Sequence, residues 1–245
     1  NAGWDEYHDG YFCRLFLRSN GSARPVTQRY VCNTLHGVSG DGKTILFIGQ
    51  DNNLYSTDGF TEKRLSDSGR IRTIALSKDQ RTIAYTTIPF EPYIHLIDTR
   101  TWTVRSVHLS VPLKDANPQP LQYADVLSFN FRGDYLFFDA VSEMKLATGE
   151  SILTWGIFGM RLADGLLFMV VAQSSDEQIS NPVMANTIDH VMLADRVVFD
   201  DHVRYHLETV SIDFNKSQIN TLLSGLTRFS QSSFKGDDRE IVYRD

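Results

Sequence analysis

The sequence predicts an all-β protein, a β-propeller of four-stranded blades. Short β-branched and aromatic runs recur between clusters of Gly, Asn, Asp and Ser, and no long segment keeps the period of a helix. One order of short strand, polar turn and apolar strand also returns about every 45 to 50 residues, the usual size of a blade, which makes about five blades. All 245 residues are therefore expected to form a single propeller domain.

The repeat is visible when its copies are read in order. The first, residues 35–66, reads LHGVSGDGKTILFIGQDNNLYSTDGFTEKRLS, and residues 71–109 repeat its order of strands and turns. The order returns in residues 125–173 and again in residues 181–223. A last half-unit, FSQSSFKGDDREIVYRD, occupies residues 229–245.

The other half of that last unit is expected at the amino-terminal end. GYFCRLFLRSNGSARPVTQ, residues 10–28, supplies two strands joined by an Asn-Gly turn. One blade cannot bury both of its apolar faces, whereas blades stacked in a ring bury each face against a neighbour. We therefore expect strands from both ends of the chain to close the ring. A pair of β-sandwiches is the alternative fold.

Two local questions stay open at this level. SEMKLATGE, residues 142–150, contains helix formers but is cut by Gly149, so the sequence allows a short helix or a loop. Cys13 and Cys32 either form a disulfide or remain two buried thiols. If Asn20 and Gly21 centre a hairpin, Cys13 lies opposite Gln28 rather than opposite Cys32.

Charge and hydropathy exclude several classes of partner. The formal net charge of −6 argues against nucleic acid, whose phosphates require clustered Lys and Arg. The longest apolar run, residues 166–172, is too short to span a membrane. The first ten residues, NAGWDEYHDG, lack the basic start and apolar stretch of a signal segment, so any export signal has been removed or never existed. We expect no cofactor.

The turns of the repeat resemble those of a known propeller family. SGDGKTILFIG, SKDQRTIAYTT, FRGDYLFFDA and FKGDDREIVYRD resemble the TolB-type propeller unit, which also occurs in the amino-terminal propellers of dipeptidyl-peptidase-like proteins. The chain departs from that unit at Gln80, where Gly is preferred, in NTIDHVML, which has no Gly, and in lacking the usual tryptophan near the first strand. The resemblance implies that the turn Asp and Gly residues are structural. It also implies an exported protein, periplasmic or secreted.

The chemical motifs of an enzyme are incomplete. No Gly-x-Ser-x-Gly nucleophile motif occurs. Five-bladed glycosidases place two carboxylates at the starts of innermost strands, but Asp125 is the only acidic residue so placed here; the other first strands begin with His36, Arg72, Asn181 and Arg228. FDDHVRYH, residues 199–206, offers two His and two Asp, yet a zinc site needs a further ligand from another loop, and we expect no metal.

We therefore expect a non-catalytic scaffold that binds a protein or a carbohydrate, with a glycoside-acting enzyme as the alternative. The predicted binding face consists of aromatic, acidic and imidazole side chains in loops between the second and third strands of the blades. Exposed Tyr and Trp bury a large area at little entropic cost. A simpler interpretation is that these side chains only cover the blade ends. The predicted residues are Trp4, Tyr7, His8, Phe90, Tyr93, Asp201, His202 and Tyr205.

Overall fold

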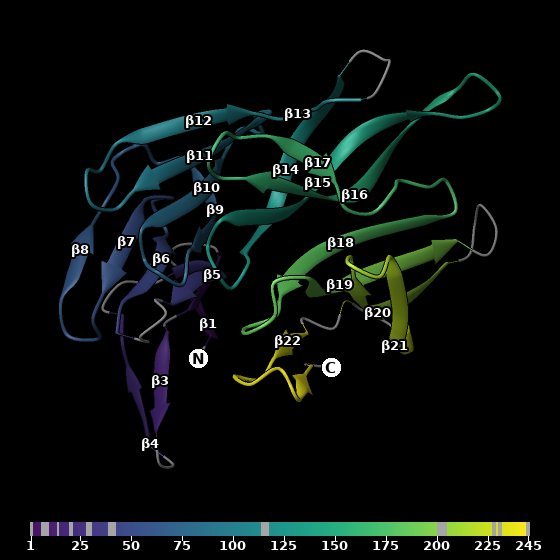
Figure 1. Cartoon of the computed structure of the whole chain (residues 1–245). Helices are drawn as coiled ribbons and strands as arrows, with labels where there is room; N and C mark the ends of the chain where they lie inside the picture. Colours follow the sequence, from purple (N-terminus) through teal and green to yellow (C-terminus); the bar gives the residue numbers. More distant parts are fainter. Residues whose placement is uncertain are drawn as a thin grey trace. The chain divides into compact units, whose positions relative to one another are not determined.

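The structure is a computed structural model that describes most of the chain. Its description leaves out residues 1, 6–9, 14, 20–21, 28–30, 39–42, 114–117, 200–204, 227–228, 230–231 and 244–245. The described residues form strands joined by turns and loops, and none of them is helical (Figure 1). The all-β prediction is confirmed.

The chain divides into two compact units, each described here by itself. The first contains Asn1–Pro89 and Leu96–Val104, and the second contains Phe90–His95 and Arg105–Asp245. The division passes through a four-stranded sheet with the order β12-β11-β10-β9. Its strands are β9 (Ile71–Leu76), β10 (Thr82–Thr87), β11 (Tyr93–Asp98) and β12 (Val104–His108).

The first unit contains a six-stranded antiparallel sheet with the order β1-β2-β5-β6-β7-β8. Its strands are β1 (Ala2–Asp5), β2 (Gly10–Cys13), β5 (Val31–Val38), β6 (Ile45–Gly49), β7 (Leu54–Thr57) and β8 (Glu62–Arg64). A separate hairpin joins β3 (Phe16–Ser19) to β4 (Ser22–Pro25), as the Asn-Gly turn predicts. Apolar residues of β6, β7, β9 and β10 form the core of this unit, among them Leu46, Leu54 and Ile74.

The second unit contains two long-stranded sheets and a short hairpin. The five-stranded sheet has the order β13-β14-β15-β16-β17, and the four-stranded sheet has the order β18-β19-β20-β21. Their strands are β13 (Ser110–Val111), β14 (Gln119–Phe129), β15 (Tyr135–Lys145), β16 (Ser151–Arg161), β17 (Leu167–Met169), β18 (Glu177–Met184), β19 (Val191–Phe199), β20 (Tyr205–Asp213) and β21 (Gln218–Leu226). The hairpin pairs β22 (Ser233–Phe234) with β23 (Ile241–Val242).

The two long-stranded sheets share one apolar core. Phe137 and Ile157 of the five-stranded sheet belong to the same buried cluster as Ile179, Met192 and Val210 of the four-stranded sheet. Each sheet thus buries one apolar face against its neighbour, which is the arrangement expected of adjacent propeller blades. The predicted units of residues 125–173 and 181–223 overlap these two sheets, whose strands begin earlier, at Ser110 and Glu177.

The polar turns between first and second strands are built as the repeat predicts. In the turn of residues 77–80, the Ser77 hydroxyl donates to Asp79, and the backbone N–H of Gln80 donates to the Ser77 carbonyl. Gln80 takes the left-handed conformation with a φ of 60°, as Gly133 does in the next sheet with a φ of 71°. The Asp and Gly positions of these turns are therefore structural.

Aspartates of such turns also contact the corresponding turn of the preceding sheet. Asp189 accepts the side-chain amide of Asn130 at 3.1 Å and the Arg132 guanidinium Nε at 2.8 Å. Asp238 in turn accepts the backbone N–H of Asn186 at 2.7 Å and the hydroxyl of Thr187 at 2.6 Å. We call these contacts the turn latches. They connect β22–β23 to the sheet of β18–β21, and that sheet to the sheet of β14–β17.

The structure corrects two local expectations. Residues 142–150 are neither a helix nor a loop with a helical turn: β15 continues to Lys145, and a turn with Gly149 at a φ of 89° leads into β16. Cys13 does not lie opposite Gln28, because it belongs to β2 and pairs with Val31 of β5. The side chains of both cysteines lie outside the described part.

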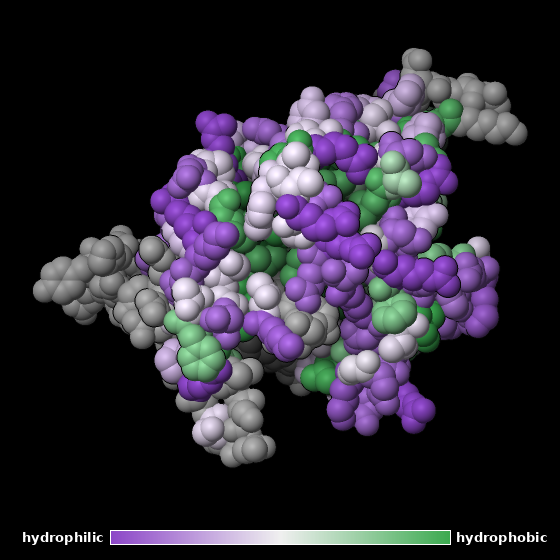
Figure 2. Space-filling view, turned by 60° about the vertical axis from the view of Figure 1, so that its left-hand side comes forward, coloured by the Kyte–Doolittle hydropathy of each residue, from purple (hydrophilic) through white to green (hydrophobic). Residues whose placement is uncertain are grey.

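The surface is that of a folded domain with its core inside. Figure 2 shows a face covered mostly by hydrophilic side chains, with hydrophobic ones gathered in small patches between them. Among the described residues, no helix has the length and apolar character needed to cross a membrane.

Candidate functional site

A row of three aromatic side chains lies in the second unit. The rings of Phe90 and Tyr123 stack at 4.3 Å with an interplanar angle of 25°, and the ring of Tyr123 meets that of Trp155 edge to face at 5.6 Å. Phe90 follows β10, Tyr123 lies on β14, and Trp155 lies on β16. We call these residues the aromatic row. Phe90 is 53% exposed although it stacks on a partner.

The strand register explains why the row forms. Tyr123 pairs with Val141 of β15, and Val141 pairs with Trp155 of β16. The two large rings therefore lie at the same level of the sheet, on the two strands that flank β15. Their side chains are long enough to meet there. Phe90 comes from the loop between β10 and β11 and covers the open face of the Tyr123 ring.

Tyr93 lies in a second small group near the start of β11. Its ring, 37% exposed, meets His108 edge to face at 5.2 Å and lies over His95 at 6.4 Å. His95 Nδ1 and the Ser106 hydroxyl are 2.8 Å apart. Burial lowers the pKa of His95, against the opposing charge of Glu91. His95 is therefore neutral at pH 7, so this group offers aromatic surface rather than charge.

Tyr205 begins β20 and is 62% exposed. It lines an apolar hollow of about 300 Å³ together with Phe199, its cross-strand partner, and with Phe229. Tyr205 thus follows a loop between second and third strands, as predicted, but its neighbours are apolar rather than polar.

The other predicted residues are less fully described. Tyr7, His8, Asp201 and His202 lie outside the described residues. The backbone of Trp4 is on β1 opposite Tyr11, and its side chain is outside the description. Among the described side chains, the structure therefore brings Phe90 together with Tyr123 and Trp155, which the sequence analysis did not select.

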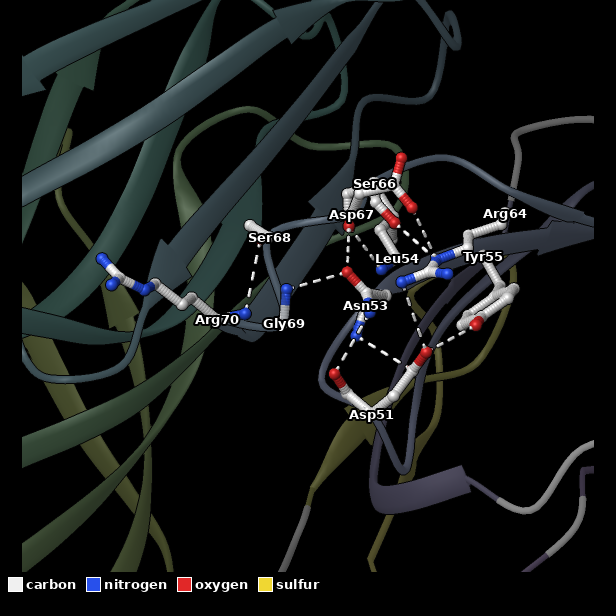
Figure 3. A network of polar contacts seen from close by, with 10 residues as sticks. All are labelled: Asp51, Asn53, Leu54, Tyr55, Arg64, Ser66, Asp67, Ser68, Gly69 and Arg70. Atoms are coloured by element: carbon white, nitrogen blue, oxygen red, sulfur yellow. Dashed lines mark hydrogen bonds and ion pairs between the residues drawn. The ribbon is translucent and has the colours of Figure 1, made fainter.

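The loop between β6 and β7 is held by a polar network (Figure 3). Asp51 accepts the Tyr55 hydroxyl at 2.8 Å and lies 3.7 Å from the Arg64 guanidinium. Burial raises the pKa of Asp51, but hydrogen bonds from Asn53 and Tyr55 outweigh it and lower the pKa below its usual value. Asp51 is therefore already engaged within its own sheet.

The buried Asn53 connects this loop to the segment that leads to β9. Its side-chain oxygen accepts the backbone N–H of Gly69 at 2.9 Å and the Ser66 hydroxyl at 3.3 Å. Its amide nitrogen donates to the backbone carbonyl of Asp51 at 3.2 Å. The network in Figure 3 is thus structural, since its main acceptors are occupied by the chain itself.

The one acidic candidate for glycoside chemistry, Asp125, lies beside a second carboxylate. Asp139 is 2% exposed and accepts the backbone N–H groups of Val126 at 2.7 Å and Asn181 at 2.8 Å. Burial, with a smaller contribution from the charge of Asp125, raises the pKa of Asp139 to about 7. Asp139 is enclosed, and backbone N–H groups at a strand irregularity occupy its oxygens, so it cannot reach a substrate. The pair of Asp125 and Asp139 therefore does not supply the acid and base of a glycosidase.

Two further observations bear on the chemistry. Within the described part of the chain, no group of three or more His, Cys, Asp or Glu residues is arranged to hold a metal ion. A cavity of about 760 Å³ lies between the sheet of β14–β17 and the sheet of β18–β21, at the turns that lead from first to second strands. None of the three residues of the aromatic row lines this cavity.

Comparison with known proteins shows which solved structures share this fold. No protein-family model and no curated protein matches the sequence. Among solved structures, TolB from Acinetobacter baumannii matches 94% of this chain with a TM-score of 0.67 and 13% identity. The fold is that of a TolB-type β-propeller.

Other solved structures match as well. The β-propeller domain of the trilobed protease from Pyrococcus furiosus, which has an open velcro topology, matches 99% of this chain with a TM-score of 0.62 and 13% identity. Dipeptidyl peptidase 4 from Porphyromonas gingivalis matches 92% with a TM-score of 0.55 and 12% identity. The chain covers 53% of TolB, 71% of the Pyrococcus chain and 40% of the peptidase.

Proposed function

We propose that this TolB-type propeller is a non-catalytic recognition module that binds a protein or a carbohydrate at the aromatic row. The observation that carries the proposal is the Phe90–Tyr123 stack, in which an aromatic side chain stays half exposed although it is held in place. A ring fixed before binding loses little conformational entropy when a ligand covers it. Both an apolar side chain of a protein and the apolar face of a sugar can pack against such a ring.

The binding face extends beyond the row in this proposal. Tyr93 begins β11 directly after the loop that carries Phe90, and Tyr205 likewise begins the third strand of its own sheet, β20. We assign Trp4, Tyr7, His8, Asp201 and His202 to the same face, because the sequence repeat places them in equivalent loops. Aromatic residues would anchor the ligand, while Asp and His would set its orientation.

The finer architecture belongs to the proposal too. We infer a single propeller of about five blades, the number given by the repeat length, in which strands from the two ends of the chain complete the last blade. We also infer export to the periplasm or the outside of the cell, because TolB-type propellers are frequently exported. A precursor without a signal segment upstream of Asn1 would contradict the location.

The experiment places a photo-crosslinking residue, p-benzoylphenylalanine, at position 90 of the whole chain. The matched control carries it at Phe60, which is 77% exposed and belongs to the first unit. Crosslinked proteins are identified by mass spectrometry, and a glycan array tests carbohydrates in parallel. We expect one protein or one glycan class to be captured at position 90 and not at position 60.

Substitutions then test the contact itself. Phe90→Ala combined with Tyr93→Ala should weaken the captured interaction about ten-fold or more, as expected for hot-spot aromatic residues. Phe60→Ala should leave it unchanged. Equal capture at positions 90 and 60, or binding that survives the double substitution, would contradict the proposal. Turnover of a captured glycan would favour the glycoside-acting alternative instead.

A further inference from the structure

The cavity between the sheets of β14–β17 and β18–β21 has the features of a built binding site. Its volume of about 760 Å³ lies within the range of about 300–1,000 Å³ that is typical of ligand pockets. Both sheets belong to the second unit, and both line the cavity: Tyr135 and Phe168 on one side, His190 and Phe214 on the other. A turn latch, Asp189 on Asn130 and Arg132, connects the two walls at its edge.

Aromatic rings form the inner surface of the cavity. Phe137, which is 2% exposed, contacts Phe214 at 5.2 Å and Phe168 at 6.3 Å, the latter edge to face. Tyr135 also meets Phe168 edge to face. Gly159 makes this packing possible, because a Cβ there would lie 2.3 Å from the end of the Phe168 ring. The apolar lining is therefore held in one arrangement before any ligand arrives.

The charged side chains around the cavity already have partners within the chain. Arg132 Nε lies 2.8 Å from an Asp189 oxygen, and Arg161 donates to both carboxylate oxygens of Asp164, with its Nε at 3.0 Å. Asp134 accepts the amide of Asn130 at 2.7 Å. A charged ligand would have to compete with these contacts, and the free-energy cost of doing so is greater than for an uncharged ligand. The lining therefore favours a ligand without net charge.

The mouth of the cavity carries aliphatic side chains. Leu166 from one sheet is 44% exposed, and Ile188 from the other is 37% exposed. Thr187 and Asn215, both exposed, lie beside them and supply hydroxyl and amide groups. An entering apolar side chain would cover both aliphatic groups. The Thr187 hydroxyl donates to Asp238, so it can accept a peptide N–H, and the Asn215 amide can bond a peptide backbone. A sugar fits less well, because it prefers the open face of a ring, and several rings here meet edge to face.

We propose that this cavity binds an uncharged peptide segment through one bulky apolar side chain, aromatic or leucine. The site is separate from the aromatic row, since Phe90, Tyr123 and Trp155 are not among the residues that line the cavity. It does not depend on the function proposed for that row.

The test uses the whole chain and a defined probe. The probe is an acetylated, amidated hexapeptide of Gly, Ser and Ala with one central 4-fluorophenylalanine, and its binding is followed by ¹⁹F NMR titration. Companion peptides carry flanking Lys or Asp residues, and maltohexaose serves as the carbohydrate competitor. We expect saturable binding of the uncharged peptide, weaker binding of both charged peptides, and no displacement by maltohexaose.

Two substitutions at the mouth locate the binding. Leu166→Arg and Ile188→Arg, one on each wall, should each weaken peptide binding about ten-fold or more, equivalent to about 1.4 kcal/mol. Because both side chains are exposed, the fold should be retained, which the melting temperature checks. Leu222→Arg, at a 40% exposed leucine of β21 that does not line the cavity, is the matched control and should bind as the parent does.

The outcomes separate this inference from the proposed function. No saturable binding, unchanged binding by both mouth variants, or displacement by maltohexaose would each overturn it. Loss of peptide binding in Phe90→Ala with retention in Leu166→Arg would move the peptide to the aromatic row, and would overturn it as well. Failure of the crosslinking experiment at Phe90 has no bearing on this result.

Discussion

Replacing Asn53 by alanine should destabilise the protein measurably, because this side chain holds two segments together. The substitution removes three hydrogen bonds, those with Gly69, Ser66 and the Asp51 carbonyl. Each is worth about 1 kcal/mol net, and an acceptor or donor left buried without a partner costs more. Asn53 itself is 2% exposed, but its partners are partly exposed and can bind water instead. We therefore expect a loss of about 2 kcal/mol.

The measurement is urea unfolding followed by circular dichroism, with the melting temperature as a second readout. A loss of about 2 kcal/mol corresponds to a fall of about 4–8 °C for a chain of this size. Ser68→Ala is the control, because Ser68 is exposed and its hydroxyl only accepts the Arg70 N–H at 3.4 Å. A double-mutant cycle of Asn53→Ala with Ser66→Ala should show coupling of about 0.5 kcal/mol or more. An Asn53→Ala protein within about 0.5 kcal/mol of the parent would refute the reasoning.

Three further substitutions follow from buried or latched groups. Because the folded pKa of Asp139 is raised to about 7, its protonated form stabilises the fold, fully below its unfolded value of 3.8, and this contribution is lost as the pH rises through 7. Asp139→Asn should therefore flatten the pH dependence of the unfolding free energy between about pH 4 and pH 7; an unaltered slope would contradict this. Gly159→Ala should cost about 1–3 kcal/mol in urea unfolding, because the new methyl group meets the Phe168 ring, and no loss would mean that the ring moves freely. Asp238→Ala should lower the melting temperature by removing the latch to Asn186 and Thr187, at about 1 kcal/mol for each bond lost; a melting temperature equal to that of the parent would show that the latch does not stabilise the fold.

The strands and turns could be predicted because their signals are local. The turn at residues 77–80 is recognisable even with Gln80 at the Gly position, since Ser and Asp at fixed offsets cap the backbone by themselves. The expectation at residues 142–150 failed for the opposite reason. Helix formers give a segment only a small preference for the helix. Because β15 is almost entirely buried up to Ser142, tertiary packing decides the conformation here.

The candidate sites could be predicted only in part. Phe90 lies in a loop and was selected, but Tyr123 and Trp155 lie inside strands, β14 and β16, and were not selected. The rings of Tyr123 and Trp155 lie at the same level of the sheet because of the register of the β14–β15 and β15–β16 hairpins. Counting the residues from the turn before β16 to Trp155 could have predicted the position of Trp155 in the sheet. The cavity was missed because its walls come from residues 130–168 and 187–215, which meet only after the sheets pack.

The turn latches have a consequence for how such a chain can diverge. Asp189 and Asp238 each bond a turn that lies 51 to 59 residues earlier, so the length of one turn is tied to the position of the next. An inserted residue would break the contact of its own turn and displace the partner turn as well. Insertions and deletions should therefore accumulate in homologues at the strand ends opposite the latched turns. Turn length at the latched ends should stay constant even where the sequence of the turns has changed.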